Sequence, residues 1–168
     1  MLKEREQEFL AKIEKHKGIL YKISKMYMDN ADDQQDMFQE ILCQLWKAYA
    51  NFRGESQFST WMYRVAINTA IVFFKKEKRK VDKDSIAHEN FQDHDEGTDV
   101  AENQLAHFYR AVQKLGKIDK AIIFYQLEGY SHREIGENLG ISEGNARVKL
   151  NRAKEKLKEI IKNQGYGF

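Results

Sequence analysis

Residues 131–157 read SHREIGENLGISEGNARVKLNRAKEKL, and this stretch decides the fold of the C-terminal part of the chain. Ser131 is a favourable residue to precede a helix, and Glu134 three residues later completes a capping box. Gly140 suits the left-handed position that ends a helix, and Ser142 can cap the next one. The stretch therefore predicts two helices joined by a turn of about three residues, which is a helix-turn-helix.

The two predicted helices each have an apolar side. Ile135 and Leu139 are expected to face inward on the first helix, with Gly136 between them. Glycine costs roughly 1 kcal/mol of helix propensity relative to alanine, and we expect a close approach of the second helix to offset that cost. On the second helix, apolar residues spaced four, three and four apart share one inward stripe. These are Ala146, Leu150, Ala153 and Leu157.

The remaining surface of the second predicted helix is basic. From Ser142 to Lys162 the chain has seven Lys or Arg residues and three Glu, a local surplus of +4. Arginine suits guanine edges, asparagine suits adenine and lysine suits phosphates, so this face favours DNA binding over a merely solvated amphipathic helix. The residues off the inward stripe are Arg147, Val148, Asn151 and Arg152. Val148 either touches a thymine methyl group or belongs to the edge of the core.

Composition sets limits on the whole chain. Its 168 residues suffice for one ordinary domain or two small ones, and the net charge is +2. There is no proline, helix-forming residues dominate, and the alternation and turns typical of strands are missing, so we expect an all-α protein. The single cysteine, Cys43, excludes an internal disulfide. The charged N-terminus is unlike a secretory signal, and the most apolar run, residues 65–74, is too short to span a membrane, which predicts a cytoplasmic protein.

Three segments of the first half carry apolar residues at helical spacing. The sets are Ile13, Leu20, Ile23, Met26 and Tyr27; Met37, Ile41, Leu42, Leu45, Trp46 and Tyr49; and Trp61, Met62, Val65, Ala66, Thr69 and Phe73. Helical spacing returns after residue 103 with Leu105, Phe108, Val112, Leu115, Ile118, Ile122, Ile123 and Leu127. The first half ends in the basic run KKEKRK, residues 75–80.

The segment between the two halves is acidic. Residues 81–103 contain eight Asp or Glu residues against one base, Lys83, and their apolar residues are sparse. Such a segment buries too little apolar surface to offset the entropy of ordering it. The sequence therefore predicts two small helical domains, residues 1–80 and 104–168, joined by a flexible acidic linker over residues 81–103.

Aromatic residues alternate with arginines in the middle of the first half: Phe52, Phe58, Trp61 and Tyr63 with Arg53 and Arg64. This mixture suits single-stranded DNA, because rings stack on unpaired bases at roughly 1–3 kcal/mol per base while cations follow the backbone. The alternative is that the aromatic side chains belong to the core.

Three stretches together resemble a known family. DMFQEILCQLWKAY (residues 36–49) and FRGESQFSTWMYRVAINTA (residues 52–70), followed by the basic run, resemble region 2 of an extracytoplasmic-function (ECF) sigma factor of the sigma-70 superfamily. LEGYSHREIGENLGISEGNARVKLNRAKEKL (residues 127–157) resembles region 4 of the same family. The resemblance covers residues 13 to 161 and has the two regions in the expected order.

The resemblance implies a bacterial transcription initiation factor that binds core RNA polymerase and directs it to promoter DNA. Region 2 would melt and read the −10 element, and region 4 would read the −35 element. The linker would thread through the polymerase. An anti-sigma factor, often membrane-anchored in this family, would hold the protein inactive, and no stable homo-oligomer is expected.

The resemblance also implies site residues. Core polymerase would be contacted by Asp36, Gln39, Glu40, Leu45 and Trp46. A flipped −10 base would lie between Phe52 and Asn68, with the loop from Arg53 through Ser56 to Phe58 shaping the pocket and Trp61, Tyr63 and Arg64 nearby. In region 4, Asn145 and Lys149 join Arg147, Val148, Asn151 and Arg152 as −35 contacts.

Two other classes of protein are less compatible with the sequence. A regulator with an N-terminal sensor domain and a helix-turn-helix output remains the alternative. An enzyme is disfavoured because no phosphate-binding glycine loop, His-Glu-x-x-His motif or nucleophile elbow occurs. The five histidines have no metal-ligand spacing, so we expect neither a metal nor a cofactor.

Overall fold

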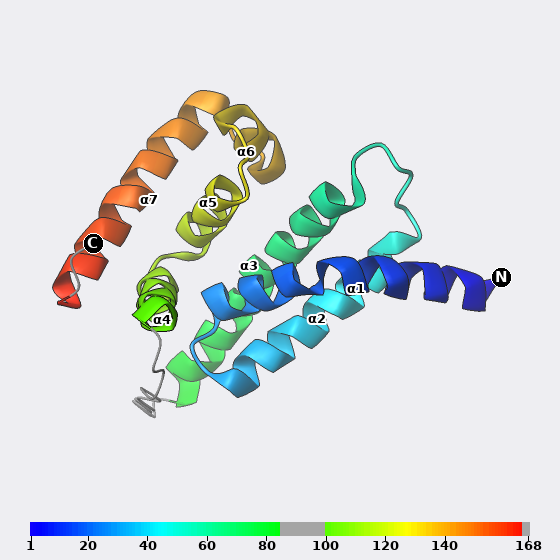
Figure 1. Cartoon of the computed structure of the whole chain (residues 1–168), viewed down its shortest axis with the longest axis horizontal. Coiled ribbons are helices and arrows are strands. Elements are labelled where there is room, and N and C mark those ends of the chain that lie inside the picture. Colours follow the sequence, from blue (N-terminus) through cyan, green and yellow to red (C-terminus); the bar gives the residue numbers. More distant parts are fainter. Residues whose placement is uncertain (85–99, 166–168) are drawn as a thin grey trace. The chain divides into compact units, whose positions relative to one another are not determined.

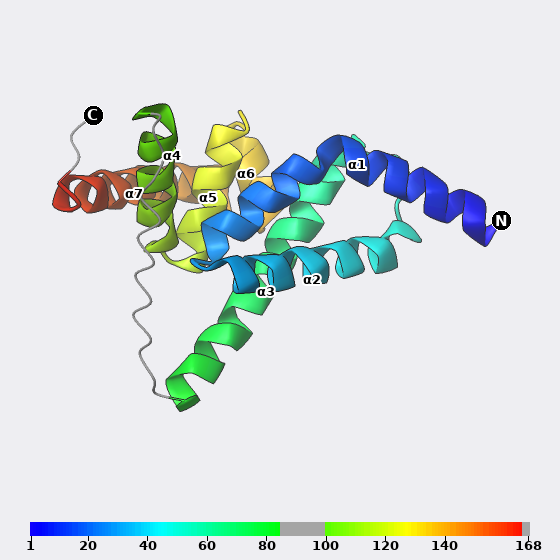
Figure 2. The same cartoon turned by 60° about the horizontal axis from the view of Figure 1, so that its bottom comes forward.

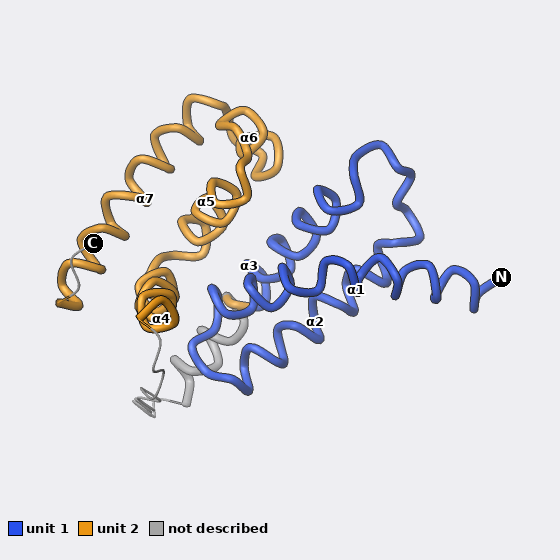
Figure 3. Tube along the Cα trace, viewed as in Figure 1, with its two compact units in different colours: residues 1–73 blue, residues 74–168 orange. Residues whose placement is uncertain are grey.

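The computed structural model describes residues 1–84 and 100–165. These residues form seven α-helices and no strand (Figure 1), which confirms the predicted all-α class. The helices are α1 (Leu2–Tyr27), α2 (Ala31–Tyr49), α3 (Phe58–Asp84), α4 (Val100–Gln113), α5 (Lys117–Leu127), α6 (His132–Leu139) and α7 (Glu143–Asn163). The chain divides into two compact units, residues 1–73 (unit 1) and 74–168 (unit 2), shown in Figure 3.

The expected linker is helical at both of its described ends. Helix α3 continues through the basic run to Asp84, and α4 begins at Val100. A charged composition predicts poor burial but does not prevent a helix from continuing for a few more residues, so the linker bounds 81 and 103 stay a prediction. Residues 85–99, the middle of that linker, lie outside the described residues.

Helices α1 and α2 form an antiparallel pair, and Figures 1 and 2 show them side by side. Asn30 caps α2, because its side chain accepts a hydrogen bond of 2.8 Å from the amide of Asp33. The side-chain amide of Gln34 donates to the carbonyl of Met28 at 2.9 Å. These bonds satisfy backbone groups at the turn that the ends of the two helices leave free.

The core of unit 1 contains most of the residues that were expected to face inward. All five from α1 are buried, and so are Met37, Ile41, Leu45 and Tyr49 of α2 and Met62 and Ala66 of α3. Each large apolar side chain buried in this way contributes roughly 1.5–3 kcal/mol. Trp46 differs, because 37% of its surface remains exposed.

The core of unit 2 is built around α7. Its predicted inward stripe, Ala146, Leu150, Ala153 and Leu157, is buried. Leu105, Ile118 and Leu127, which were also expected to face inward, are instead 52%, 37% and 55% exposed. Helical spacing predicts which residues share a face, but it does not tell how far along the helix a packing partner extends.

The turn between α6 and α7 has the predicted caps. Both bonds of the capping box are present: the amide of Glu134 donates to the Ser131 hydroxyl at 3.1 Å, and the amide of Ser131 donates to the Glu134 carboxylate at 2.8 Å. Gly140 ends α6 with φ of 72°, in the left-handed region where glycine is favoured.

Gly136 is required by the turn itself. A Cβ atom placed on it would lie 2.7 Å from the carbonyl oxygen of Ile141, whose own amide donates to the Gly136 carbonyl at 2.9 Å. The expectation that the second helix approaches Gly136 is therefore corrected: the close neighbours are backbone atoms of Ile141 and Ser142 in the turn. A side chain at this position would displace backbone that holds the two helices together.

We predict that Gly136→Ala lowers the free energy of unfolding of unit 2 by about 1–3 kcal/mol, because overpacking outweighs the gain in helix propensity. Urea unfolding of the full chain, followed by circular dichroism, measures the change. Gly144→Ala in α7 is the matched control, because a Cβ there meets nothing within 4 Å and should leave stability unchanged or slightly raised. Equal stability of Gly136→Ala and wild type would contradict this account of the turn.

Candidate nucleic-acid interfaces

The outer face of α7 presents most of the residues predicted to contact duplex DNA. Asn145, Arg147, Val148, Asn151 and Arg152 are exposed. Val148 is 46% exposed, so it lies on the outer face and not in the core. Because successive residues of a helix are turned by about 100°, these side chains cover the side opposite the buried stripe. Lys149 is half-buried and lies on the flank of that face.

Arg147 is held by residues of both helices. Its Nε donates a long hydrogen bond of 3.4 Å to Nδ1 of His132 at the start of α6. One terminal nitrogen lies 3.8 Å from the carboxylate of Glu143. An exposed ion pair of this kind contributes little, about 0–1 kcal/mol, so it does not prevent the guanidinium from binding a base. Sequence patterns did not indicate His132, because the bond joins residues on two different helices.

The structure brings Phe52, Phe58 and Trp61 into one ring cluster. The ring centroids of Phe52 and Trp61 are 5.0 Å apart, those of Phe58 and Trp61 are 5.4 Å apart, and those of Phe52 and Phe58 are 5.8 Å apart. Tyr49 is buried behind them, at 6.2 to 6.3 Å from each. The three front rings are half-buried, so each keeps some surface toward solvent.

The other residues predicted for the −10 element divide into two groups. Arg53, Ser56, Arg64 and Asn68 are exposed. Asn68 follows Trp61 by two turns of α3, about 10 Å along the same side of the helix. Tyr63 is only 8% exposed, so its predicted contact with DNA is corrected to a place in the core of unit 1.

Helix α1 contributes side chains to the ring cluster that sequence reasoning missed. Nζ of Lys12 lies 5.5 to 5.6 Å from the ring centroids of Tyr49, Phe52 and Phe58. The Arg5 guanidinium lies 5.5 Å from the Tyr49 centroid, and the His16 and Phe58 rings are 5.9 Å apart. The helical spacing of residues 5, 12 and 16 indicates that they share one face of α1. Nothing in the sequence indicates that this face packs against the loop.

Lys12 is also paired with a carboxylate. Its ammonium lies 3.3 Å from Glu8, one turn earlier on α1. Partial burial lowers the pKa of Lys12, but hydrogen bonds and charge interactions with Glu8 and Tyr49 outweigh burial and raise the pKa above its usual 10.5. The side chain is therefore a permanent cation beside the rings at physiological pH.

The residues expected to contact polymerase follow α2. Asp36 and Gln39 are exposed, and Glu40 is half-buried with its carboxylate accepting a 3.0 Å hydrogen bond from Gln44. Leu45 has no exposed surface. Its predicted direct contact is therefore corrected: the side chain supports α2 from within the core.

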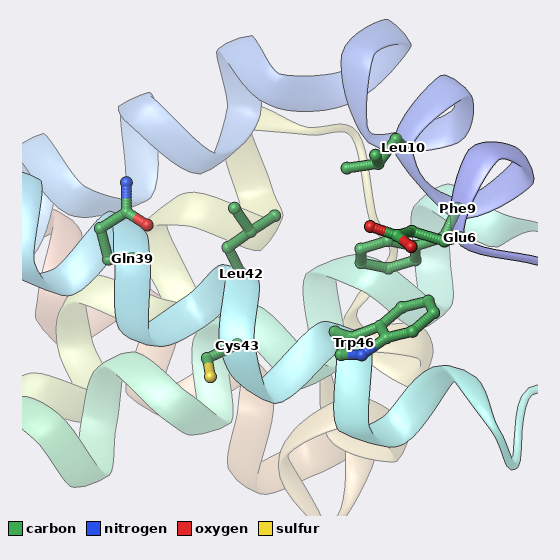
Figure 4. Close-up of a pocket in the computed structure, with 7 residues that line it drawn as sticks. All are labelled: Glu6, Phe9, Leu10, Gln39, Leu42, Cys43 and Trp46. Atoms are coloured by element: carbon green, nitrogen blue, oxygen red, sulfur yellow. The ribbon is translucent and has the colours of Figure 1, made fainter. Parts of the chain in front are cut away.

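A shallow apolar groove of about 280 Å³ lies between α1 and α2. Figure 4 shows its lining: Glu6, Phe9 and Leu10 from α1, and Gln39, Leu42, Cys43 and Trp46 from α2. Leu10 and Trp46 are 50% and 37% exposed. Exposed apolar surface beside carboxylates is typical of a protein-binding face, and Gln39 and Trp46 were both predicted to bind polymerase.

Within residues 1–84 and 100–165, no group of three His, Cys, Asp or Glu side chains is arranged to hold a metal ion. Among the same residues, no helix combines the length and the apolar character that a membrane span requires.

Residues 13–80 match the model of sigma-70 region 2, and residues 106–157 match that of sigma-70 region 4. The ECF RNA polymerase sigma-E factor of Haemophilus influenzae is 30% identical over 142 residues, which cover 77% of this chain and 75% of that protein. The Escherichia coli K12 sigma-E factor is 30% identical over 137 residues, 74% and 72% of the two chains. The chain belongs to the ECF sigma factors of the sigma-70 family. It is therefore a transcription initiation factor, as the sequence predicted.

Two solved structures share the fold. The sigma factor RpoE of Bartonella quintana, solved with the anti-sigma factor NepR, matches with a TM-score of 0.72 and 22% identity over 93% of this chain and 98% of that one. CnrH, solved with the cytosolic domain of CnrY, matches with a TM-score of 0.65 and 19% identity over 94% and 90%. The region 2 match begins at residue 13, whereas α1 begins at Leu2, so Phe9 and Lys12 lie on turns that precede it.

We predict that Arg147→Ala weakens binding to the preferred −35 sequence by about 1–3 kcal/mol and relaxes preference at one base pair, if the guanidinium is bidentate to guanine. Binding of holoenzyme to a panel of −35 variants measures both effects. Lys149→Ala is the control, because a phosphate contact on the flank would weaken all sequences evenly and lower the salt dependence. An even loss for Arg147→Ala across the panel would reduce Arg147 to a phosphate contact.

Proposed function

We propose that this sigma factor binds core RNA polymerase through α2 and directs it to promoters, where unit 1 opens and reads the −10 element while α7 reads the −35 element. The observation that carries this proposal is the ring cluster of Phe52, Phe58 and Trp61, bordered by cations, in a chain whose other unit has a capped helix-turn-helix. One unit is suited to unpaired bases and the other to duplex DNA.

The −10 pocket would lie along α3. Phe52 supplies a stacking surface, Asn68 supplies a donor and an acceptor for a base edge, and the exposed loop from Arg53 to Phe58 borders the site. Flipping a base out of the duplex costs a few kcal/mol, and contacts of this kind offset that cost. The exposure of Asn68 and the half-burial of Phe52 support the assignment.

Polymerase binding is assigned to the outer face of α2. Asp36 and Glu40 offer carboxylates to basic residues of the polymerase, and the adjoining groove, with Trp46 at its edge, offers apolar surface. A central apolar contact with a charged rim is the usual composition of a protein interface. Leu45 acts only by supporting this helix from the core.

An anti-sigma factor is the second proposed partner. The two solved proteins of the same fold are each seen with a protein partner, NepR and CnrY. Working on polymerase and promoter DNA requires the chain to act in the cytoplasm, where such a partner would hold it until released. Nucleotide polymerisation belongs to the polymerase, so we assign the chain no enzymatic activity of its own.

The direct test is reconstitution with core RNA polymerase purified from the same bacterium, followed by mapping of the transcripts made from genomic DNA. We predict initiation at a set of promoters that share two sequence elements, with no further regulator present. Asp36→Lys should lower the affinity for core enzyme several-fold, and more at low salt, because the charges are exposed and screened. Glu14→Lys, an exposed acid of α1 outside the groove, is the matched control.

A regulator with a sensor domain would give a different result in this reconstitution. It would bind duplex DNA without polymerase, and adding it to core enzyme would not change where transcription starts. Equal affinity of Asp36→Lys and wild type would reject α2 as the polymerase-binding face.

A further inference from the structure

We propose that Lys12, on α1, is a further nucleic-acid-binding residue of unit 1, and that its ammonium contacts the phosphate beside the unpaired base at the ring cluster. This inference rests on the proposed function of unit 1 at the −10 element. It adds to the site a residue from a helix turn that precedes residue 13, where the region 2 match begins.

The position of the ammonium carries the inference. Nζ of Lys12 lies at nearly equal distances, 5.5 to 5.6 Å, from three ring centroids. It therefore lies where the Tyr49, Phe52 and Phe58 rings converge. Sites for single-stranded nucleic acid place a cation beside stacking rings, because the phosphate of a nucleotide is close to its base.

The ammonium is also available to a ligand. It forms an ion pair with Glu8, and the two side chains are 35% and 60% exposed. Such a pair is weak in water, and an ammonium has three donors, so a phosphate can replace or join the carboxylate. The raised pKa of Lys12 keeps the charge in place at the pH of the cell.

Neighbouring residues give the site a basic rim. Arg5 lies against Tyr49 and His16 against Phe58, both from the same helix as Lys12. Arg53 follows Phe52 and is exposed in the loop. Together with Lys12, Arg5 and Arg53 place three positive charges around the rings, which suits a sugar-phosphate backbone.

The test measures salt dependence with intact holoenzyme. The probe is a fork-junction DNA taken from a promoter mapped as described above, duplex through the −35 element and single-stranded across the −10 element. Affinity falls as salt rises, and the loss of one phosphate contact on a single strand makes the slope of log affinity against log salt shallower by about 0.7. We expect Lys12→Gln to make the slope shallower by that amount and to weaken the affinity several-fold at about 0.1 M salt. We expect Lys12→Arg to retain the wild-type slope and affinity.

The matched control is Lys17→Gln. Lys17 is on the same helix and pairs with Glu14 at 2.7 Å, but it is turned by about 140° around the helix from Lys12. Its removal should leave the slope unchanged. Thermal unfolding of both variants shows that unit 1 remains folded.

Each outcome decides the assignment. An unchanged slope for Lys12→Gln overturns it, even if affinity falls, because lost packing weakens binding without changing the number of phosphates neutralised. If wild-type holoenzyme shows no preference for the sequence of the single-stranded −10 region, the proposed function of unit 1 fails and the role of Lys12 fails with it. A wild-type preference with an unchanged slope for Lys12→Gln rejects only Lys12.

Discussion

The packing of aromatic rings around Tyr49 is the interaction on which unit 1 depends. Tyr49 ends α2, and its ring is approached by Phe9 of α1, by Phe52 and Phe58 at the two ends of the following loop, and by Trp61 of α3. Each such ring pair contributes about 0.5–1.5 kcal/mol beyond the burial of its area. One buried ring thus connects three helices and both ends of a loop.

This connection fixes the path of the polar, glycine-containing loop that we propose as part of the −10 site. Residues 50–57 include Gly54 with φ of 74°, and backbone bonds to α2 are made only at their start, by Asn51 and Phe52. Without the rings, the loop would have few contacts to fix its path. Because Phe52 and Phe58 pack on Tyr49, both ends of the loop have fixed positions, and the exposed side chains between them are held in place. The face of α3 that follows the loop is fixed in the same way.

In unit 2, backbone geometry rather than ring packing holds the proposed DNA-binding surface in place. Backbone geometry fixes its recognition helix: a capping box, a left-handed glycine and the contact between Gly136 and the Ile141 carbonyl. The two arrangements suit the targets that we propose for the two units. A duplex is a regular partner that requires one helix to be held at a fixed angle, whereas an unpaired base requires a surface that can stack.

The sequence was sufficient for the features that depend on local spacing. The caps at Ser131 and Ser142 and the inward stripe of α7 were predicted because they are set within a few residues. The burial of Tyr63 was not predicted, because helical periodicity cannot distinguish a buried aromatic side chain from an exposed one. Leu45 was expected both to face inward and to contact polymerase, and its burial agrees only with the first expectation. Lys12 and His132 were missed because their partners lie on other elements, and only the fold brings them together.

The central claim is that one unpaired base lies between Phe52 and Asn68, and fluorescence of 2-aminopurine placed at each −10 position tests it most directly. With wild-type holoenzyme, the signal should rise at one position as that base leaves the stack. Asn68→Ala should still bind polymerase and duplex −35 DNA but give a much smaller rise, and DNA opened beforehand should restore only part of the transcription, because base recognition is still missing. If Asn68→Ala opens promoters as well as wild type, or if opened DNA restores full activity, the pocket does not exist and Asn68 is an ordinary surface residue of α3.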